Sequence, residues 1–287
     1  MSVAVSPAPI KQRQITAGLW SGLRKWLAFY RVAFADALAY RASAVIWLLT
    51  DTFPAIVMPL IWLASYHGRP TIGGFSPSQM VVYYLNVLFL SCVVESHIMW
   101  DIASYVKDGS INSYLTRPFS FAATTYAQNV SWRLMRSLMF IPLFCLVLGI
   151  FHRWVHWDAG QYNFGWSFWL AVILGHFVSF FLAYAMGMLA FFVIEVQSIY
   201  YAYYLPEILF NGQIAPLSFF PHAIAKFANL LPFVYTMSFP AQVFVGRIKG
   251  PALWMGLAYQ VGWIVIAYAA GALLYREGLK RYASSGI

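Results

Sequence analysis

The sequence predicts an all-α membrane protein that crosses the bilayer six times. Hydrophobic residues make up 61% of the 287 residues and charged residues only 9%, whereas soluble domains carry about 25% charged residues. Several uncharged runs reach the roughly 20 apolar residues that a helix needs to cross a bilayer. Length would allow one or two soluble domains, but this composition favours a multi-pass membrane protein.

The N-terminal part is expected to stay outside the bilayer core. Residues 1–16 are polar and contain proline, which predicts a flexible tail. In residues 17–42, apolar side chains recur at steps of three and four, the helical period, and basic residues lie between them. A basic amphipathic helix with tryptophan is typical of the membrane interface. We therefore predict an interfacial elbow helix at residues 17–42.

A six-span transmembrane domain is expected at residues 43–280. Its spans are predicted at residues 43–66, 79–100, 134–151, 166–194, 199–219 and 252–275. Residues 212–251, before the last span, are apolar but contain five prolines, which break helices. Backbone at membrane depth must be buried in protein or line a cavity. This segment therefore predicts short, re-entrant helices.

The distribution of charge predicts the orientation. The chain has a net charge of +9, which fits loops that face anionic lipid headgroups better than it fits a nucleic-acid partner. Residues 1–42, 101–137, 195–198 and 276–287 together hold 13 basic residues, and the other loops hold 5. The positive-inside rule then places both termini in the cytoplasm.

Motifs for chemistry within the chain are missing from the sequence. It has no G-x-x-x-x-G-K-[ST] loop for nucleotide phosphates, no H-E-x-x-H and no G-x-S-x-G. Cys92 and Cys145 stand alone in separate apolar runs, so they do not predict a metal or redox site. We expect no catalytic, cofactor or metal site in this chain.

Polar residues within apolar runs are the candidates for a substrate pathway: Asp51, Glu95, Tyr204, Glu207 and Asn211. Intramembrane acids are costly and are commonly functional. Glu95 lies near the expected cytoplasmic end of its span, where neighbouring groups would satisfy it. For Asp51 and Glu207, a structural and a functional role stay open. Tyr204 ends a tyrosine-rich run that is typical of an aromatic belt and could also line the pathway.

A polar stretch at residues 101–118 separates the second and third spans. Its pattern is Gly109, then Ile111, Leu115, Arg117 and Pro118. Together with the preceding spans, the elbow helix and the proline-broken region, this pattern resembles the type-two ABC exporter permeases, specifically those whose ATPase is a separate chain. The resemblance covers about residues 20–280, and residues 109–118 are its most specific part.

The resemblance implies a coupling helix at about residues 101–116 that docks in a groove of the ATPase. Ile102, Tyr105 and Val106 would be its apolar contacts, and Asp101, Lys107 and Asp108 its polar ends. Gly109 would let the chain reverse, and Pro118 would stop the next turn. The simpler alternative is an ordinary amphipathic cytoplasmic loop.

The family also implies a non-catalytic transport subunit that exports drugs or lipids. Its partners would be two copies of a separate ATPase, which holds ATP and Mg²⁺, and a second permease chain, identical or homologous. The ATPase would push on the coupling helix and tilt the first, second and fifth spans. Two alternatives stay open: a proton-coupled secondary transporter that uses Asp51 or Glu207, and a membrane-embedded lipid-modifying enzyme, for which the acids are too scattered.

Overall fold

A computed structural model describes residues 10–39, 41–116, 119–155 and 162–284 of the chain. These residues are helical apart from connecting loops and one isolated bridge between Ile72 and Phe75. The α-helices are α1 Ile10–Ala39, α2 Arg41–Ser65, α3 Pro77–Val93, α4 Ile98–Lys107, α5 Ile111–Leu115, α6 Phe121–Ile150, α7 Trp166–Gly187, α8 Val196–Phe210, α9 His222–Ala228, α10 Ser238–Phe244 and α11 Pro251–Ser284. Three short 3₁₀ helices complete the described part: η1 Met188–Phe191, η2 Leu217–Phe219 and η3 Pro232–Tyr235.

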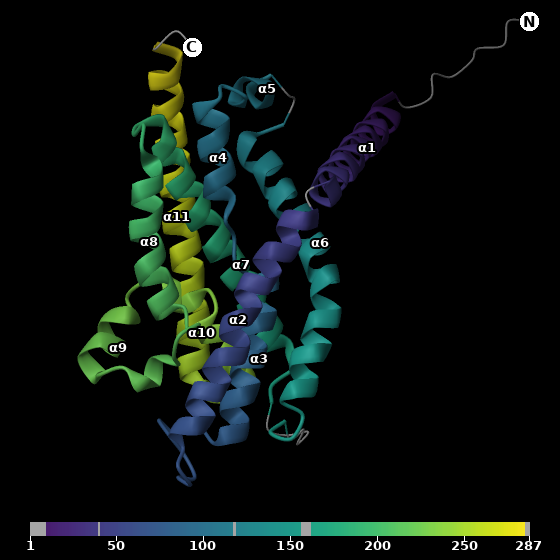
Figure 1. The fold of residues 1–287 in the computed structure, drawn as a ribbon. Coiled ribbons are helices and arrows are strands. Elements are labelled where there is room, and N and C mark those ends of the chain that lie inside the picture. Colours follow the sequence, from purple (N-terminus) through teal and green to yellow (C-terminus); the bar gives the residue numbers. More distant parts are fainter. Residues whose placement is uncertain (1–9, 40, 117–118, 156–161, 285–287) are drawn as a thin grey trace, which may run out of the picture.

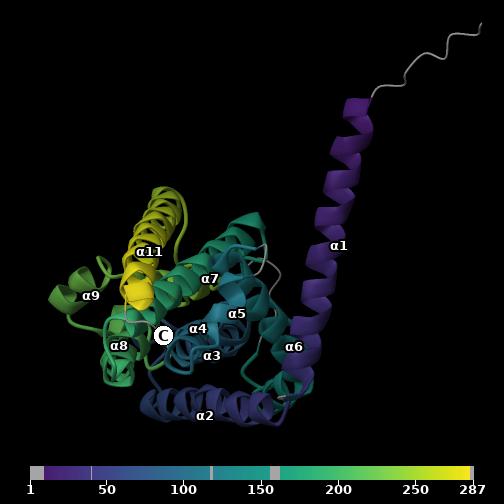
Figure 2. The same ribbon diagram turned by 90° about the horizontal axis from the view of Figure 1, so that it is seen from above.

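Five candidate membrane spans form a bundle of long helices (Figure 1). They are α2, α3 with α4 (Pro77–Lys107), α6, α7 with η1 (Trp166–Phe191) and most of α11 (Pro251–Tyr282). The second of them occupies the centre, because 83% of its most apolar window is buried. Seen from above, α2, α6, α7 and α8 surround it (Figure 2). The start of α1, the end of α11 and α5 all lie at one end of the bundle (Figure 1).

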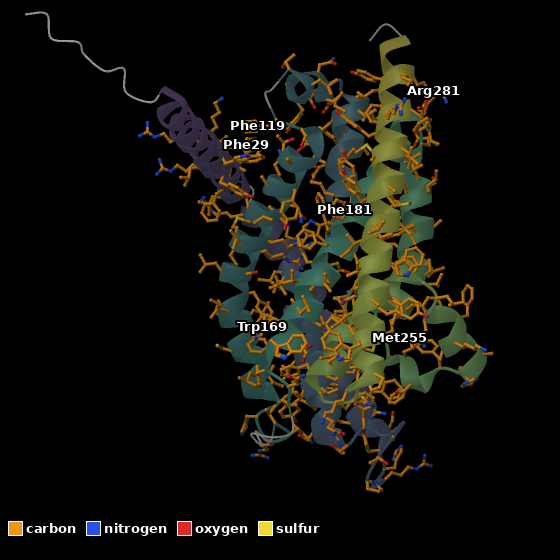
Figure 3. All side chains as sticks on the ribbon, turned by 180° about the vertical axis from the view of Figure 1, so that it is seen from behind. Phe29, Phe119, Trp169, Phe181, Met255 and Arg281 are labelled. Carbon is orange, nitrogen blue, oxygen red and sulfur yellow. The ribbon has the colours of Figure 1, made fainter. Side chains whose placement is uncertain are left out.

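The N-terminal helix is longer than the sequence predicted. α1 begins at Ile10, so residues 10–16, which we had assigned to the flexible tail, are helical; residues 1–9 lie outside the described part. α1 ends at Ala39 and extends away from the bundle (Figure 2). Its inner end packs on the start of α6, where the ring of Trp26 lies 4.6 Å from that of Phe119. Figure 3 shows Phe29 beside the same ring.

Two predicted spans differ in their bounds from the observed helices α6 and α8. α6 starts at Phe121 instead of residue 134, because its polar first half is buried inside the bundle and needs no bilayer. α8 ends at Phe210, whereas the predicted fifth span ran to residue 219. Its 15 residues rise about 22 Å, less than the ~30 Å hydrocarbon core. Among the described residues, five helices and not six therefore reach spanning length.

The proline-rich region before the last span forms short helices, as predicted. Pro216, Pro221 and Pro232 each stand at or just before the start of a short helix, where the missing N–H of proline costs nothing. Gln260 of α11 ties this region to α7: its Nε2 donates hydrogen bonds to the carbonyls of Ala171 at 2.8 Å and Tyr235 at 2.9 Å.

A clasp joins two loops at the end of the bundle opposite α5. The guanidinium of Arg247 donates to the carbonyls of Gly74 at 2.7 Å and Gly73 at 3.3 Å. The same group lies 4.1 Å above the ring of Phe75, a cation–π geometry. A Cβ at Gly73 would meet the ring of Phe219, so only glycine lets this loop approach η2 this closely.

Candidate functional site

Two regions of the bundle hold the residues singled out in the sequence. The first is the tip formed by α4, the turn at residues 108–110 and α5. The second is a buried polar cluster at residues 94–97, where the second span is interrupted between α3 and α4. Figure 1 places the tip at the end of the bundle and the interruption further inside it.

The turn between α4 and α5 depends on Gly109. Its φ is +76°, in the left-handed region that glycine adopts without strain. Asp108 closes α4, so Gly109 takes the position after the helix C-cap where glycine is preferred. The Oδ1 atom of Asp108 accepts a hydrogen bond from the N–H of Ser110 at 2.9 Å, and hydrogen bonds from Ser110 lower the pKa of Asp108. The predicted chain reversal is confirmed.

The expected coupling helix differs from the observed tip. Residues 101–107 belong to α4, which continues the second span, and only α5 lies across the tip (Figure 1). Ile102, expected to fill a groove of the ATPase, is fully buried in its own bundle. A Cβ on Gly187 of α7 would lie 2.9 Å from its Cδ1 atom, so α4 and α7 are in close contact there. Ile111 is also fully buried.

The surface open to a partner is therefore smaller than predicted. Lys107, Asp108 and Leu115 are exposed, with Leu115 40% exposed. Asp101 is exposed on α4, and Tyr105 and Val106 are half-buried. Arg117 and Pro118, which carry part of the family pattern, lie outside the described residues.

Contacts on the inner side of α5 lead to three other helices. The ring of Tyr114 lies 4.8 Å from that of Tyr105 on α4. Its hydroxyl accepts a hydrogen bond from Nε2 of Gln128 on α6 at 2.9 Å. Nδ2 of Asn112 donates to the hydroxyl of Tyr282 on α11 at 3.3 Å. A force on α5 would thus reach α4, α6 and α11. We had expected it to tilt the first, second and fifth of the six predicted spans.

At the interruption of the second span, backbone carbonyls lose their hydrogen-bond partners within the helix. Side chains from other helices contact these carbonyls instead. Nη1 of Arg133 on α6 donates to the carbonyls of Ser91 at 3.0 Å and Cys92 at 3.3 Å. Nδ1 of His176 on α7 lies 3.2 Å from the carbonyl of Val94. These are the last carbonyls of α3, which have no partner within the helix. A cation at a helix C-terminus also complements the helix dipole.

Ser96 makes two further hydrogen bonds at this interruption. Its backbone N–H donates to Oγ of Ser179 on α7 at 2.9 Å, and its hydroxyl donates to Oδ1 of Asn129 on α6 at 3.0 Å. Helices α6 and α7 therefore both hydrogen-bond to the broken segment. An unpaired backbone group at this depth would cost several kcal/mol, so the break requires these polar partners.

Glu95 lies in this interruption and is buried, with 6% of its surface exposed. The prediction that it sits near the end of its span was wrong, because the helix continues through α4 to Lys107. Its Oε1 accepts a hydrogen bond from Nε2 of Gln213 at 3.0 Å. The charge of Arg133 also acts on it. A buried carboxylate requires such partners.

Three of the five pathway candidates come together around this carboxylate. Glu207 of α8 is 5% exposed and interacts electrostatically with Glu95. The charges of both acids, and of Arg133 and Arg136, act on the hydroxyl of Tyr204, whose ring stacks on His97 at 5.7 Å. This arrangement favours a place within the bundle for Tyr204 over a peripheral aromatic belt.

The other two candidates are separate or undescribed. Asn211 is fully buried just after α8, and its Oδ1 accepts a hydrogen bond from the N–H of Gln213 at 3.0 Å. It thereby positions the residue that binds Glu95. Asp51 lies on α2, but its side chain is outside the described part.

Sequence reasoning did not select Arg133 and Arg136, which lie at the start of the span predicted at residues 134–151. They are 6% and 2% exposed, respectively, deep in α6. Their i, i+3 spacing could have indicated this role, because it puts both arginines on one face of a helix within a largely apolar run. Without them, the loops assigned to the cytoplasm hold eleven basic residues against five, so the positive-inside argument keeps its direction.

The cluster combines buried charges with hydrogen bonds. Within the described ranges, no three His, Cys, Asp or Glu side chains are grouped to hold a metal ion. Two carboxylates and two guanidiniums, closed off from water, form a network whose members depend on one another. Such a network fixes how α3, α4, α6 and α8 fit together.

A family model supports the interpretation of the fold. The model described as "ABC-2 family transporter protein" matches residues 53–286. The chain therefore belongs to the ABC-2 transporter family, and it is the multi-pass membrane component of an ABC transporter. This family works with an ATP-binding subunit. A search of curated proteins found no match.

Proposed function

We propose that this chain is the permease subunit of an ABC exporter, which docks a separate ATPase through α5 and the turn before it. The observation that carries the proposal is the construction of the tip. α5 is anchored by buried Ile111 and by contacts to α4, α6 and α11. Its outer side leaves Leu115 and Asp108 exposed. A small surface that is firmly tied to several spans suits a part that receives force from a partner.

The complex would contain two permease chains, identical or homologous, and two ATPase chains that bind ATP and Mg²⁺. It would lie in the inner or plasma membrane with both termini cytoplasmic. In support, α5, the start of α1 and the end of α11 lie at the same end of the bundle (Figure 1). The transported molecule would be hydrophobic or amphiphilic, since the interior is rich in aromatic side chains.

Transport requires two states whose balance ATP changes. In this proposal, ATP binding closes the ATPase pair and moves α5. The hydrogen bonds of Asn112 and Gln128 pass this motion to α11 and α6. The contact of Ile102 with Gly187 passes it to α7. The chain itself performs no hydrolysis, and family membership argues against both the proton-coupled and the lipid-modifying alternatives.

The proposal is tested by purifying the tagged chain from native membranes in mild detergent and identifying its companions by mass spectrometry. We expect a P-loop ATPase at one copy per permease chain, and a second permease-like chain would indicate a heterodimer. A lone chain without ATP hydrolysis would refute the proposal and direct attention to Asp51 and Glu207.

A matched pair of variants locates the docking surface. Leu115→Asp should reduce ATPase recovery by about tenfold or more, because a charge would be buried at the centre of a small interface. Ile224→Asp on α9 is the control: Ile224 is 41% exposed, close to the 40% of Leu115, and lies away from α5 toward the other end of the bundle. Equal recovery with both variants would show that α5 is not the docking element.

A further inference from the structure

A groove of about 340 Å³ lies between α2 and α6 and shares no residue with the tip or the polar cluster. All seven side chains that line it are apolar. Leu48, which is 4% exposed, forms its floor and belongs to the same packed cluster as Met139 and Leu143 of α6. Leu49 and Leu146, which are 56% and 59% exposed, form its rims. The groove therefore has a closed floor and an open outer side.

The groove is elongated along the helices and faces lipid. Its lining on α6 runs from Met139 to Leu146, a rise of about 10 Å. Its volume is more than twice the ~150 Å³ of a cavity that binds benzene. Only 25% of the most apolar window of α2 and 28% of that of α6 is buried in the protein, so the open side lies toward the bilayer. A long, apolar, lipid-facing groove fits one acyl chain better than it fits a compact molecule.

The end of α1 closes one end of the groove. Met139, which lines the groove, packs together with Phe34 of α1 and Trp132 around the buried side chain of Met135. The junction of α1 and α2 lies beside α6 (Figures 1 and 2). An acyl chain in the groove would leave its headgroup at this junction, because the groove runs from there into the spanning parts of α2 and α6.

The charge at this junction selects the headgroup. Arg41 begins α2 and stands four residues before Val45, which lines the groove, and residues four apart share a helix face. Arg31 stands one turn before Phe34 on α1. Both arginines are exposed, and neither forms an ion pair within the part of the chain that the structure describes. Residues 24–41 hold four basic residues and one acidic residue, so the junction is complementary to an anion.

We propose that this groove binds one acyl chain of an anionic phospholipid, such as a phosphatidylglycerol, whose phosphate is held by Arg41 and Arg31. Arginine matches the geometry of a phosphate with paired hydrogen bonds. A zwitterionic phospholipid has the same chains, but its cationic group offsets the attraction of its phosphate to the two arginines. The bound lipid would tie α1 to α2 and α6.

Binding needs only this chain, whereas its assignment to the cytoplasmic leaflet rests on the orientation in the proposed function above. Loss of the lipid preference would overturn this site alone. Failure to recover an ATPase would overturn the proposed function alone.

The experiment titrates the full-length chain in detergent with palmitoyl-oleoyl phosphatidylglycerol or with phosphatidylcholine of the same chains, and native mass spectrometry counts the bound lipids. We expect the wild type to prefer phosphatidylglycerol about tenfold or more, because each arginine near an anionic headgroup contributes a factor of about five. Arg41→Gln should lower this preference about fivefold. Arg276→Gln removes another exposed arginine, on α11 across the bundle from α2 (Figure 2), and should behave like the wild type.

Two further measurements test the acyl chain. Val45→Trp fills the groove and should weaken binding of both lipids. Val265→Trp adds the same ring at a position of α11 that is 60% exposed and should leave both affinities unchanged. Glycerol 1-phosphate carries the phosphate without chains and should not displace bound phosphatidylglycerol.

Equal affinity of the wild type for both lipids would overturn the proposal and indicate an acyl-chain site without headgroup selection. Equal loss of the preference in Arg41→Gln and Arg276→Gln would overturn it in favour of diffuse surface charge. Displacement by glycerol 1-phosphate, or full binding by Val45→Trp, would show that the groove holds no chain. If Val45→Trp does not fold, the two arginine variants and the displacement by glycerol 1-phosphate decide the question.

Discussion

Replacing Gly109 by alanine tests whether the shape of the tip controls coupling. At a φ of +76°, any residue with a Cβ costs about 1–2 kcal/mol. The added Cβ itself has room, because its nearest neighbour would be the hydroxyl of Tyr282 at 3.8 Å. The whole effect thus comes from the backbone. If the strain is relieved by rotating α5, the correctly placed population falls about 5- to 30-fold.

The assay reconstitutes the permease with its ATPase and measures transported substrate per ATP hydrolysed. We expect Gly109→Ala to lower this ratio while the complex still assembles, and Gly109→Pro to remove coupling, because proline fixes φ near −65°. Gly109→Asn should retain most coupling, since asparagine tolerates the left-handed region.

Gly68 supplies the matched control for this prediction. Its φ is +81° and no atom lies within 4 Å of an added Cβ, so Gly68→Ala introduces similar strain in the loop between α2 and α3. Both alanine variants should lose comparable thermal stability, but only Gly109→Ala should lose coupling. Unchanged coupling in Gly109→Ala, or equal loss in both variants, would refute the reasoning.

Two further substitutions test the interior and the outer clasp. Arg133→Met should destabilise the protein by about 1–3 kcal/mol, because it removes the donor to the carbonyls of Ser91 and Cys92 and the positive charge that acts on buried Glu95; thermal unfolding measures this, and a second change, Glu95→Gln, should restore part of the loss. A full loss that persists in the double variant would contradict the pairing. Arg247→Gln should cost about 1 kcal/mol or less, since the side chain is exposed, but should speed labelling of a cysteine placed at exposed Thr71 in the same loop as Gly74; an unchanged labelling rate would mean that the clasp does not hold the two loops together.

The sequence was informative where local chemistry decides the structure. Gly109 could be assigned to a chain reversal because few other residues adopt its backbone conformation. The prolines before the last span predicted short helices because each removes a backbone donor. The apolar runs located most spans, because a bilayer imposes a length and a composition that are visible in one segment alone.

It failed where a residue's role depends on what packs against it. Ile102 lies on an amphipathic stretch, and amphipathicity does not say whether the apolar face meets a partner or the chain's own α7. Arg133 was not selected as a site residue because its acceptors, the carbonyls of Ser91 and Cys92, are about forty residues away in sequence.

The interruption at residues 94–97 divides the second span into two helices, α3 and α4, which are joined inside the bundle. α4 rises about 15 Å over its ten residues. Because α4 lies in close contact with Gly187, we expect it to move together with α7. α3, by contrast, packs mainly on α2, α6 and α10. A displacement of about 3 Å at α5 would therefore pivot α4 by roughly 11° about this joint without bending a continuous helix. The charged cluster lies at this joint, so rotation of α4 would change how its charges face one another.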